Sequence, residues 1–277
     1  MLDFGNVLIL SKKELYDARQ NRWLALYTVA FASLSLGLAY LALAGAGSFG
    51  VAGFGRTSAS LINLVLLIVP LMGLTLGALA IAGEREKGTL IYLMAQPITQ
   101  LELLLGKFIG LALALGASLG IGFGLTAAVI ALRGGSTTIG AYLLLMLLTM
   151  LLAIATLSLG LLISTAVQRG ATAIGLALFF WLLLVYFGDL GLLGTALVLR
   201  LDVQQLFTIT LANPLQLFKI AAIMGMGNNL EVLGPAGIYA LRTYGSRLLP
   251  LLLGLLVLWI GAPLSLAGLL FQRKGVL

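Results

Sequence analysis

Long apolar segments without any charged side chain constrain this chain more than any other feature. A helix needs about 20 consecutive apolar residues to cross a bilayer. Six segments of about this length occur, at residues 23–44, 61–82, 108–132, 140–167, 171–188 and 248–271. The sequence therefore predicts an all-α integral membrane protein, with six transmembrane helices in one domain that covers residues 1–277.

The amino-acid composition excludes several classes of function. Of the 277 residues 61% are hydrophobic and only 9% are charged, whereas soluble domains carry about 25% charged residues. Residues 1–10 lack the basic start and the cleavage site of a removable signal peptide. There is no cysteine and no histidine, which excludes zinc ligation by these residues and catalysis by Ser-His or Cys-His pairs. The composition therefore argues against an intramembrane metalloprotease.

The distribution of lysine and arginine predicts the orientation in the membrane. Six spans place both termini on one side, and the short loops on the opposite side hold only Arg56 and Arg133. The side of the termini holds ten basic residues near span ends: Lys12, Lys13, Arg19, Arg22, Arg85, Lys87, Lys107, Arg169, Arg273 and Lys274. The positive-inside rule then places both termini in the cytoplasm. Since the basic residues form no continuous stripe, the net charge of +7 does not indicate a nucleic-acid partner.

Residues 1–22 have the pattern of an amphipathic helix that lies in the membrane interface. The residues predicted to share its apolar face are Phe4, Val7, Leu8, Ser11, Leu15 and Ala18. An extended cytosolic start to the first membrane helix is the alternative that the pattern leaves open. The loop predicted at residues 45–60 contains a G-x-G-x-x-G match, which we reject because a membrane helix rather than a strand precedes it.

The predicted spans contain small residues at intervals of four and no ionisable side chains. The rows are Gly73 and Gly77; Gly106 and Gly110; Gly116, Gly120 and Gly124; and Thr156, Gly160 and Ser164. Such rows allow close packing of membrane helices, either within one subunit or between two. We expect a homodimer, because six helices make only a thin-walled unit. Proton or sodium coupling is poorly supported, so energy for transport has to enter from outside the spans.

The segment at residues 189–247 is predicted to form short helices on the outer face, with a re-entrant hairpin at residues 190–199. Asn213 before Pro214 is typical of an N-cap followed by the first helical residue. Met224 and Met226 have thioethers that suit Cu(I). Two methionines are fewer than a usual ligand set and often fill apolar gaps, so we predict no metal site and keep this pair only as weak candidates.

The loop at residues 83–107 holds the densest charge cluster. Residues 83–89 read G-E-R-E-K-G-T, but Thr89 stands where a P-loop requires lysine, so this motif does not bind ATP. Residues 90–94 can form a short helix that ends at the Gln96-Pro97 turn. Thr99 with Glu102 predicts a capping box at the start of the next helix. The charge pattern alone slightly favours a plain solvated cytoplasmic turn.

Three motifs of this loop resemble those of ABC-2-type transporter permeases. They are E-R-E-K-G-T-L at residues 84–90, A-Q-P-I-T at residues 95–99 and L-G-K at residues 105–107. The resemblance implies that residues 88–95 form a coupling helix in a groove of a separate ATPase. The residues it implies in coupling are Glu84, Arg85, Glu86, Lys87, Gly88, Thr89, Gln96 and Pro97. It also implies a homodimer with two ATP-binding subunits, which hold ATP and Mg, and no cofactor in this chain. Since ATP hydrolysis resides in those subunits, the resemblance implies that this chain is not an enzyme.

Within that family, the sequence is most similar to permeases of transporters that mature the copper sites of nitrous oxide reductase. This similarity implies a bacterial inner membrane, a copper- or sulfur-related cargo and a periplasmic copper-maturation partner. The candidate docking residues are Asp202, Asn213, Pro214 and Arg242. Two alternatives remain open. One is a scaffold without transport, and the other is an enzyme that would need Asp189, Asp202 and Glu231 to converge.

Overall fold

The computed structural model describes residues 3–45, 52–132, 139–199, 202–225 and 235–274, and every regular element in these ranges is a helix. Six helices are long and apolar enough to cross a membrane. They are α2 (Arg22–Gly45), α3 (Ala52–Glu86), α5 (Gln100–Leu132), α6 (Ile139–Ala166), α7 (Gly170–Leu199) and α11 (Leu248–Lys274). The prediction of an all-α membrane protein with six spans is confirmed.

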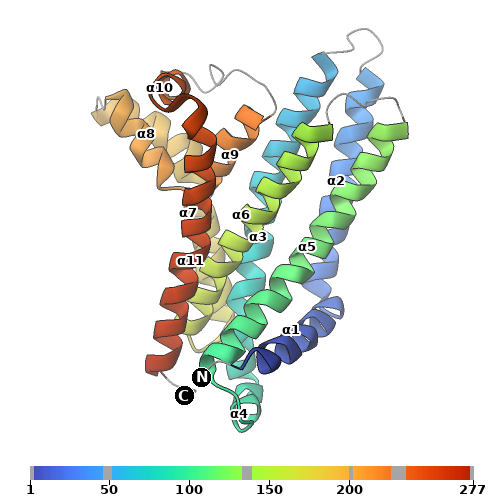
Figure 1. The fold of residues 1–277 in the computed structure, drawn as a ribbon, viewed down its shortest axis with the longest axis vertical. Coiled ribbons are helices and arrows are strands. Elements are labelled where there is room, and N and C mark those ends of the chain that lie inside the picture. The colour runs from blue at the N-terminus through green and yellow to red at the C-terminus, as the bar shows by residue number, and fades with distance from the viewer. Residues whose placement is uncertain (1–2, 46–51, 133–138, 200–201, 226–234, 275–277) are drawn as a thin grey trace.

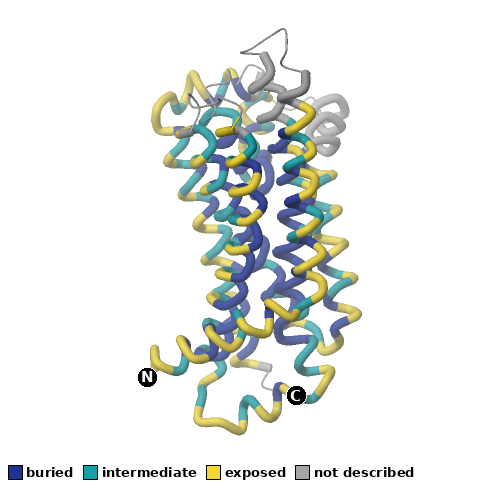
Figure 2. The backbone as a smooth tube through the Cα atoms, turned by 90° about the vertical axis from the view of Figure 1, so that its right-hand side faces the viewer, coloured by how far each residue is buried: buried dark blue, intermediate teal, exposed yellow. Residues whose placement is uncertain are grey.

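The bundle has one buried pair of helices at its centre and two distinct ends. In the α3 and α6 spans, 72% and 61% of the residues are buried, against 22% in each of the α7 and α11 spans. Both termini, α1 and α4 lie at one end, called the terminal end below, and α8 and α10 lie at the opposite, far end (Figure 1). Buried positions follow the interior of the bundle, whereas exposed positions dominate the loop at the terminal end (Figure 2).

Small residues bring α3 and α6 into backbone contact. A Cβ added to Gly77 would lie 2.5 Å from the Leu157 carbonyl oxygen, and one added to Gly160 would lie 2.5 Å from the Leu74 carbonyl oxygen. The Ser164 hydroxyl accepts hydrogen bonds from the amides of Ile81 and Ala82 at 2.9 and 2.8 Å. These two rows of small residues therefore pack within one subunit, the first of the two uses that the sequence allowed.

Helix α1 (Phe4–Arg19) lies across the terminal end and packs on α5. On the predicted apolar face Val7, Ser11 and Ala18 are buried, whereas Phe4 and Leu8 are 82% and 58% exposed. The reason is the contact with α5: Gly106 and Gly110 admit the side chains of Leu10 and Glu14, which sets the rotation of α1. Apolar side chains on the outer side remain available to lipid, as in an interfacial helix.

Two boundaries differ from the sequence prediction. Helix α3 starts at Ala52, so residues 52–60 are helical rather than loop, because glycine and small polar residues are tolerated in membrane helices. Helix α7 continues to Leu199, so the predicted hairpin at residues 190–199 is wrong. The sharp bend lies further on, where α8 (Val203–Leu211) and α9 (Pro214–Gly225) meet at 106°.

The remaining elements close the far end. They are α10 (Pro235–Tyr244) and the short 3-10 helix η4 (Gly245–Arg247), which leads into α11. The stretch that qualifies as the sixth span already begins at Gly237, ahead of the predicted start at residue 248. Phe207 of α8 is buried between Tyr239 and Tyr244, with ring centroids 6.0 and 5.7 Å away. Aromatic packing therefore joins α8 to the segment before α11.

Candidate functional site

The loop between α3 and α5 contains the predicted short helix, α4 (Thr89–Met94). Gly88 precedes it with φ of 74°, a left-handed conformation that glycine adopts without strain. On α4 itself Leu90 is fully buried, while Ile91 and Tyr92 are 59% and 78% exposed. The loop therefore presents an apolar surface at the terminal end of the bundle, with one side chain anchored below it.

A capping box starts α5, as predicted. The Thr99 amide donates to Glu102 Oε2 at 2.9 Å, and the Glu102 amide donates to Thr99 Oγ1 at 3.3 Å. The same carboxylate accepts from the Asp3 amide at 2.8 Å and from Asn6 Nδ2 at 3.3 Å. Glu102 therefore fixes both the end of the loop and the start of α1.

Glu84 lies against the bundle and is one of the two carboxylates in an ion-pair cluster. Lys107 Nζ on α5 lies 2.7 Å from Glu84 Oε1 and 3.0 Å from Glu14 Oε2 on α1. The Lys107 side chain is only 2% exposed. One ammonium group therefore connects α1, α3 and α5 at the base of the loop.

Arg85 and Glu86 connect the end of α3 to the turn between α6 and α7. Arg85 Nη1 donates to the Val167 carbonyl at 2.7 Å, and the Gly170 amide donates to Glu86 Oε2 at 2.8 Å. The carbonyl end of α6 favours a cation and the amide end of α7 favours an anion, so both charges complement the helix dipoles. The charged motif thus fastens the loop to neighbouring helices instead of pointing only to solvent.

The structure divides the eight residues implied in coupling into two groups. Glu84, Arg85 and Glu86 make the internal contacts just described, and Gly88 is half-buried. Lys87, Thr89, Gln96 and Pro97 are exposed and make none of these internal contacts, and Glu86 is exposed as well despite its hydrogen bond to the Gly170 amide.

Sequence reasoning missed the ion pairs of Glu14 and Lys107, although Lys107 was counted among the basic residues that predict topology and in the L-G-K motif. A lone lysine among apolar residues at the entry to a span is the signal that could have indicated a buried ion pair.

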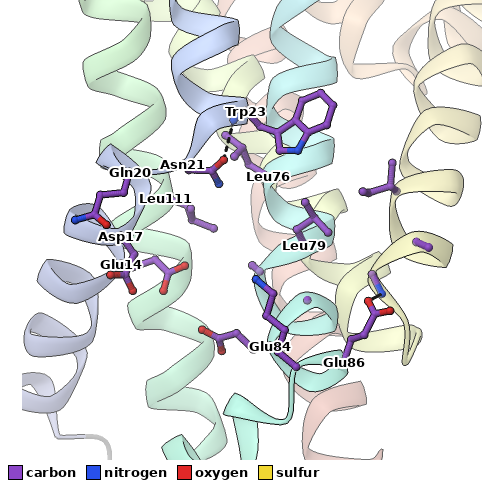
Figure 3. Close-up of a pocket in the computed structure, with 16 residues that line it drawn as sticks. Glu14, Asp17, Gln20, Asn21, Trp23, Leu76, Leu79, Glu84, Glu86 and Leu111 are labelled. Carbon is purple, nitrogen blue, oxygen red and sulfur yellow. Dashed lines mark hydrogen bonds between the residues drawn. The ribbon is translucent and has the colours of Figure 1, made fainter.

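A cavity of about 700 Å³ opens beside this cluster, between α1, α3 and α7 (Figure 3). Its lining includes the carboxylates of Glu14, Glu84 and Glu86 and the apolar side chains of Trp23 and Leu79. An exposed pair nearby joins Lys13 to Asp17 at 2.9 Å. Partial burial opposes protonation of Lys13, but the hydrogen bond to Asp17 and its charge outweigh this, so the pKa of Lys13 is raised.

The far-end docking candidates are not all accessible. Asp202 and Arg242 are exposed, whereas Pro214 is buried. The Asn213 side chain faces inward: its Oδ1 accepts from the Leu215 amide at 2.9 Å, as an N-cap does, and its Nδ2 donates to the Leu184 carbonyl at 2.7 Å. Asn213 therefore has a structural role in joining α9 to α7.

The weak metal candidates gain no support from their surroundings. Met224 is partly buried and packs against the core, while Met226 lies outside the described residues. Within the described ranges no group of three or more acidic residues could hold a metal ion. The Asp189 side chain and Glu231 also lie outside the description, so convergence with Asp202 stays untested.

The fold and the loop define a multi-pass helical membrane subunit with a short helix presented at one end. The family model for ABC-2 family transporter protein matches residues 8–276. The chain belongs to this ABC-2 family of transporter proteins, and it is the permease of an ABC transporter. An ABC-2 permease works with an ATP-binding subunit, so such a subunit is its partner.

Two relatives are similar over almost their whole length. A probable ABC transporter permease protein NosY from Stutzerimonas stutzeri is 33% identical over 271 residues, which cover 96% of this chain and 97% of that protein. A protein of the same name from Pseudomonas aeruginosa is 34% identical over 276 residues, which cover 98% of this chain and 99% of that protein. The motif resemblance seen in the sequence is therefore confirmed at the level of the family and of NosY-like permeases.

Proposed function

We propose that α4 is the surface on which the ATP-binding subunit docks, so that ATP hydrolysis in that subunit moves the membrane helices. The observation that carries this proposal is the contrast within α4. Ile91 and Tyr92 are exposed at the tip, and Leu90 is fully buried beneath them. Exposed aromatic and aliphatic side chains on a rigid support are typical anchors of protein interfaces.

The contacts at the base of the loop support transmission to more helices than the two that flank it. The loop is continuous in the chain with α3 and α5. Lys107 adds α1 to this set, and the hydrogen bonds of Arg85 and Glu86 add the turn between α6 and α7. A displacement of α4 would then move these helices as rigid bodies.

We also propose that the terminal end is cytoplasmic, that the membrane is a bacterial inner membrane, and that two copies form a homodimer with two ATP-binding subunits. The basic residues at the terminal end support the orientation. The low burial of α7 and α11, 22% of the residues in each span, leaves wide surfaces for a second copy or for lipid. In the same arrangement ATP and Mg are bound by the partner subunit.

The cargo we propose is related to copper or sulfur and serves the maturation of nitrous oxide reductase. The resemblance to NosY-like permeases supports it, and the exposed side chains of Asp202 and Arg242 at the far end would contact a periplasmic partner. No metal group within the described residues adds to this argument. The cargo proposal therefore depends on the resemblance alone.

The docking proposal is tested by co-purification of the ATP-binding subunit with variants of the exposed face. I91D and Y92D should each weaken retention of the subunit by about tenfold, since a charge opposes burial of an apolar contact. The matched control is I209D, because Ile209 is 47% exposed on α8 at the far end. Equal retention by all three variants would refute docking on α4. Retention without any change in ATP turnover would favour the scaffold without transport.

A further inference from the structure

Lys107 is as deeply buried as Glu102, each 2% exposed, and in the part of the chain that the structure describes it forms ion pairs with two carboxylates. Its ammonium group lies 2.7 Å from a carboxylate of α3 and 3.0 Å from a carboxylate of α1, and the lysine belongs to α5. The exposed fractions are 2% for the Lys107 side chain, 13% for Glu14 and 21% for Glu84. The cluster therefore lies inside the junction of three helices and not on their surface.

Net stability alone does not explain why this buried ion-pair cluster is present. Desolvation of buried charges roughly cancels their attraction, so apolar residues of similar size would pack at the junction about as well. Directional N–H···O bonds differ from apolar contacts because they fix one relative position of the groups they join. Buried polar groups are best supported in this role of fixing a register.

The surroundings show where this register matters. Glu84 lies two residues before the end of α3, at the start of the loop, and Lys107 lies on the first turns of α5, beyond the end of the loop. Their ion pair therefore closes the base of the loop that carries α4. Glu14 and Glu84 also line the cavity of about 700 Å³ (Figure 3), and Ile174 of α7 lines it as well.

We propose that Lys107 is a positioning residue for energy coupling: it holds the interfacial helix α1 and both ends of the loop in one rigid unit. The interfacial helix then moves together with α4 when the ATP-binding subunit moves. The functional meaning of this unit rests on the proposed docking of that subunit. The rigidity itself is a property of the permease alone and can be measured without the partner.

Spin labels test the rigidity directly. The chain has no cysteine, so Y16C and Y92C create two unique sites, on α1 and on α4, where the native side chains are 61% and 78% exposed. The distance distribution between the labels is measured by double electron–electron resonance on the full chain in lipid nanodiscs. When the labelled chain is diluted with an excess of unlabelled chain, so that a dimer carries one labelled copy, we expect one narrow peak in the otherwise unaltered chain.

Substitutions in the cluster then show how much each ion pair contributes to the rigidity. K107M should lose the narrow peak, and E84M and E14M, each of which removes a single link, should broaden it. The triple reversal E14K/E84K/K107E keeps both ion pairs with their charges exchanged and should restore the narrow peak. The matched control is D17M, because Asp17 pairs with Lys13 on the surface of the same helix and should leave the peak unchanged.

A narrow peak in K107M, E84M and E14M alike would overturn the proposal. If K107M does not assemble, narrow peaks in both E84M and E14M would overturn the proposal in the same way. With the ATP-binding subunit added, K107M should still retain that subunit but no longer change its ATP turnover. If the unaltered permease fails to retain the subunit, the docking proposal fails, and the spin-label result still decides the role of Lys107.

Discussion

The loop at the terminal end and the helices α8 to α10 at the far end are both short helical insertions between membrane helices, but they are held by different forces. At the terminal end, charged side chains bind backbone groups and one another, as with Arg85 and the Val167 carbonyl at 2.7 Å. At the far end, Phe207, Tyr239 and Tyr244 form an aromatic cluster.

The two ends therefore have different mechanical properties. Ion pairs and charged hydrogen bonds are directional and fix the loop relative to its neighbours. Aromatic packing is less directional and tolerates small shifts between helices. The loop is thus suited to transmit displacement, and the far end is suited to adjust to it. Substitutions at the two ends should therefore differ in their effects on stability and on the ATP-binding subunit.

The largest loss of stability is expected for F207A at the far end. Phe207 is 2% exposed, and removal of a buried phenyl ring costs about 3 kcal/mol. Thermal unfolding in detergent should show this loss, whereas retention of the ATP-binding subunit should not change. A loss of that subunit from folded F207A would show that the two ends are not separate in function.

A smaller loss is expected for R85M, which removes the hydrogen bond to the α6 carbonyl. Such a charged hydrogen bond contributes about 1.5 kcal/mol. Without this hydrogen bond the loop is no longer attached to the turn between α6 and α7. The permease should then change ATP turnover far less than the small loss of stability would indicate. R85K serves as the control, because it keeps the charge near Val167. Normal coupling in R85M would contradict a role for this link.

A loss of about 1 kcal/mol is expected for G88A, since alanine is strained in the left-handed conformation. Gly88 has φ of 74°, and the space around it is open, so strain is the only structural cost. The matched control is G83A, whose added methyl group meets nothing closer than 3.9 Å. Loss of ATPase stimulation in G88A but not in G83A is the expected result. Equal behaviour of both variants would argue against a fixed orientation of α4.

The smallest effect is expected for D17N, which removes the exposed pair with Lys13. A pair of this kind contributes about 0.5 kcal/mol, and the two side chains are 43% and 53% exposed. The pair should weaken with added salt, whereas the buried contacts of Lys107 should not. Thermal midpoints at low and high salt measure the difference. A large loss in D17N would show that surface charge, not the buried cluster, holds α1.

Much of the fold could be predicted from the sequence, because membrane spans depend on local apolar length. The spans, the capping box of Thr99 and Glu102, and the N-cap at Asn213 are all local patterns. The continuation of α7 to Leu199 was missed, because small and polar residues near position 190 read as a break in sequence. Once packed against neighbours, such residues remain in a membrane helix at little cost.

The candidate site was predicted in part. The position of α4 follows from local signals, whereas the partners of Glu84, Arg85 and Glu86 lie 23, 82 and 84 residues away along the chain. No local pattern indicates that Lys107 meets both Glu14 and Glu84, since these contacts depend on how α1, α3 and α5 are packed. The sequence therefore indicated which residues matter but not which way their side chains point.

The most direct test of the account asks whether α4 touches the ATP-binding subunit. Y92C or I209C, each the only cysteine in the chain, is labelled with a maleimide–benzophenone reagent, and the complex is illuminated. We predict a cross-link to the ATP-binding subunit from position 92 on α4 and none from position 209 on α8. A cross-link from position 209, or none from position 92 in a complex that retains the subunit, would contradict the account.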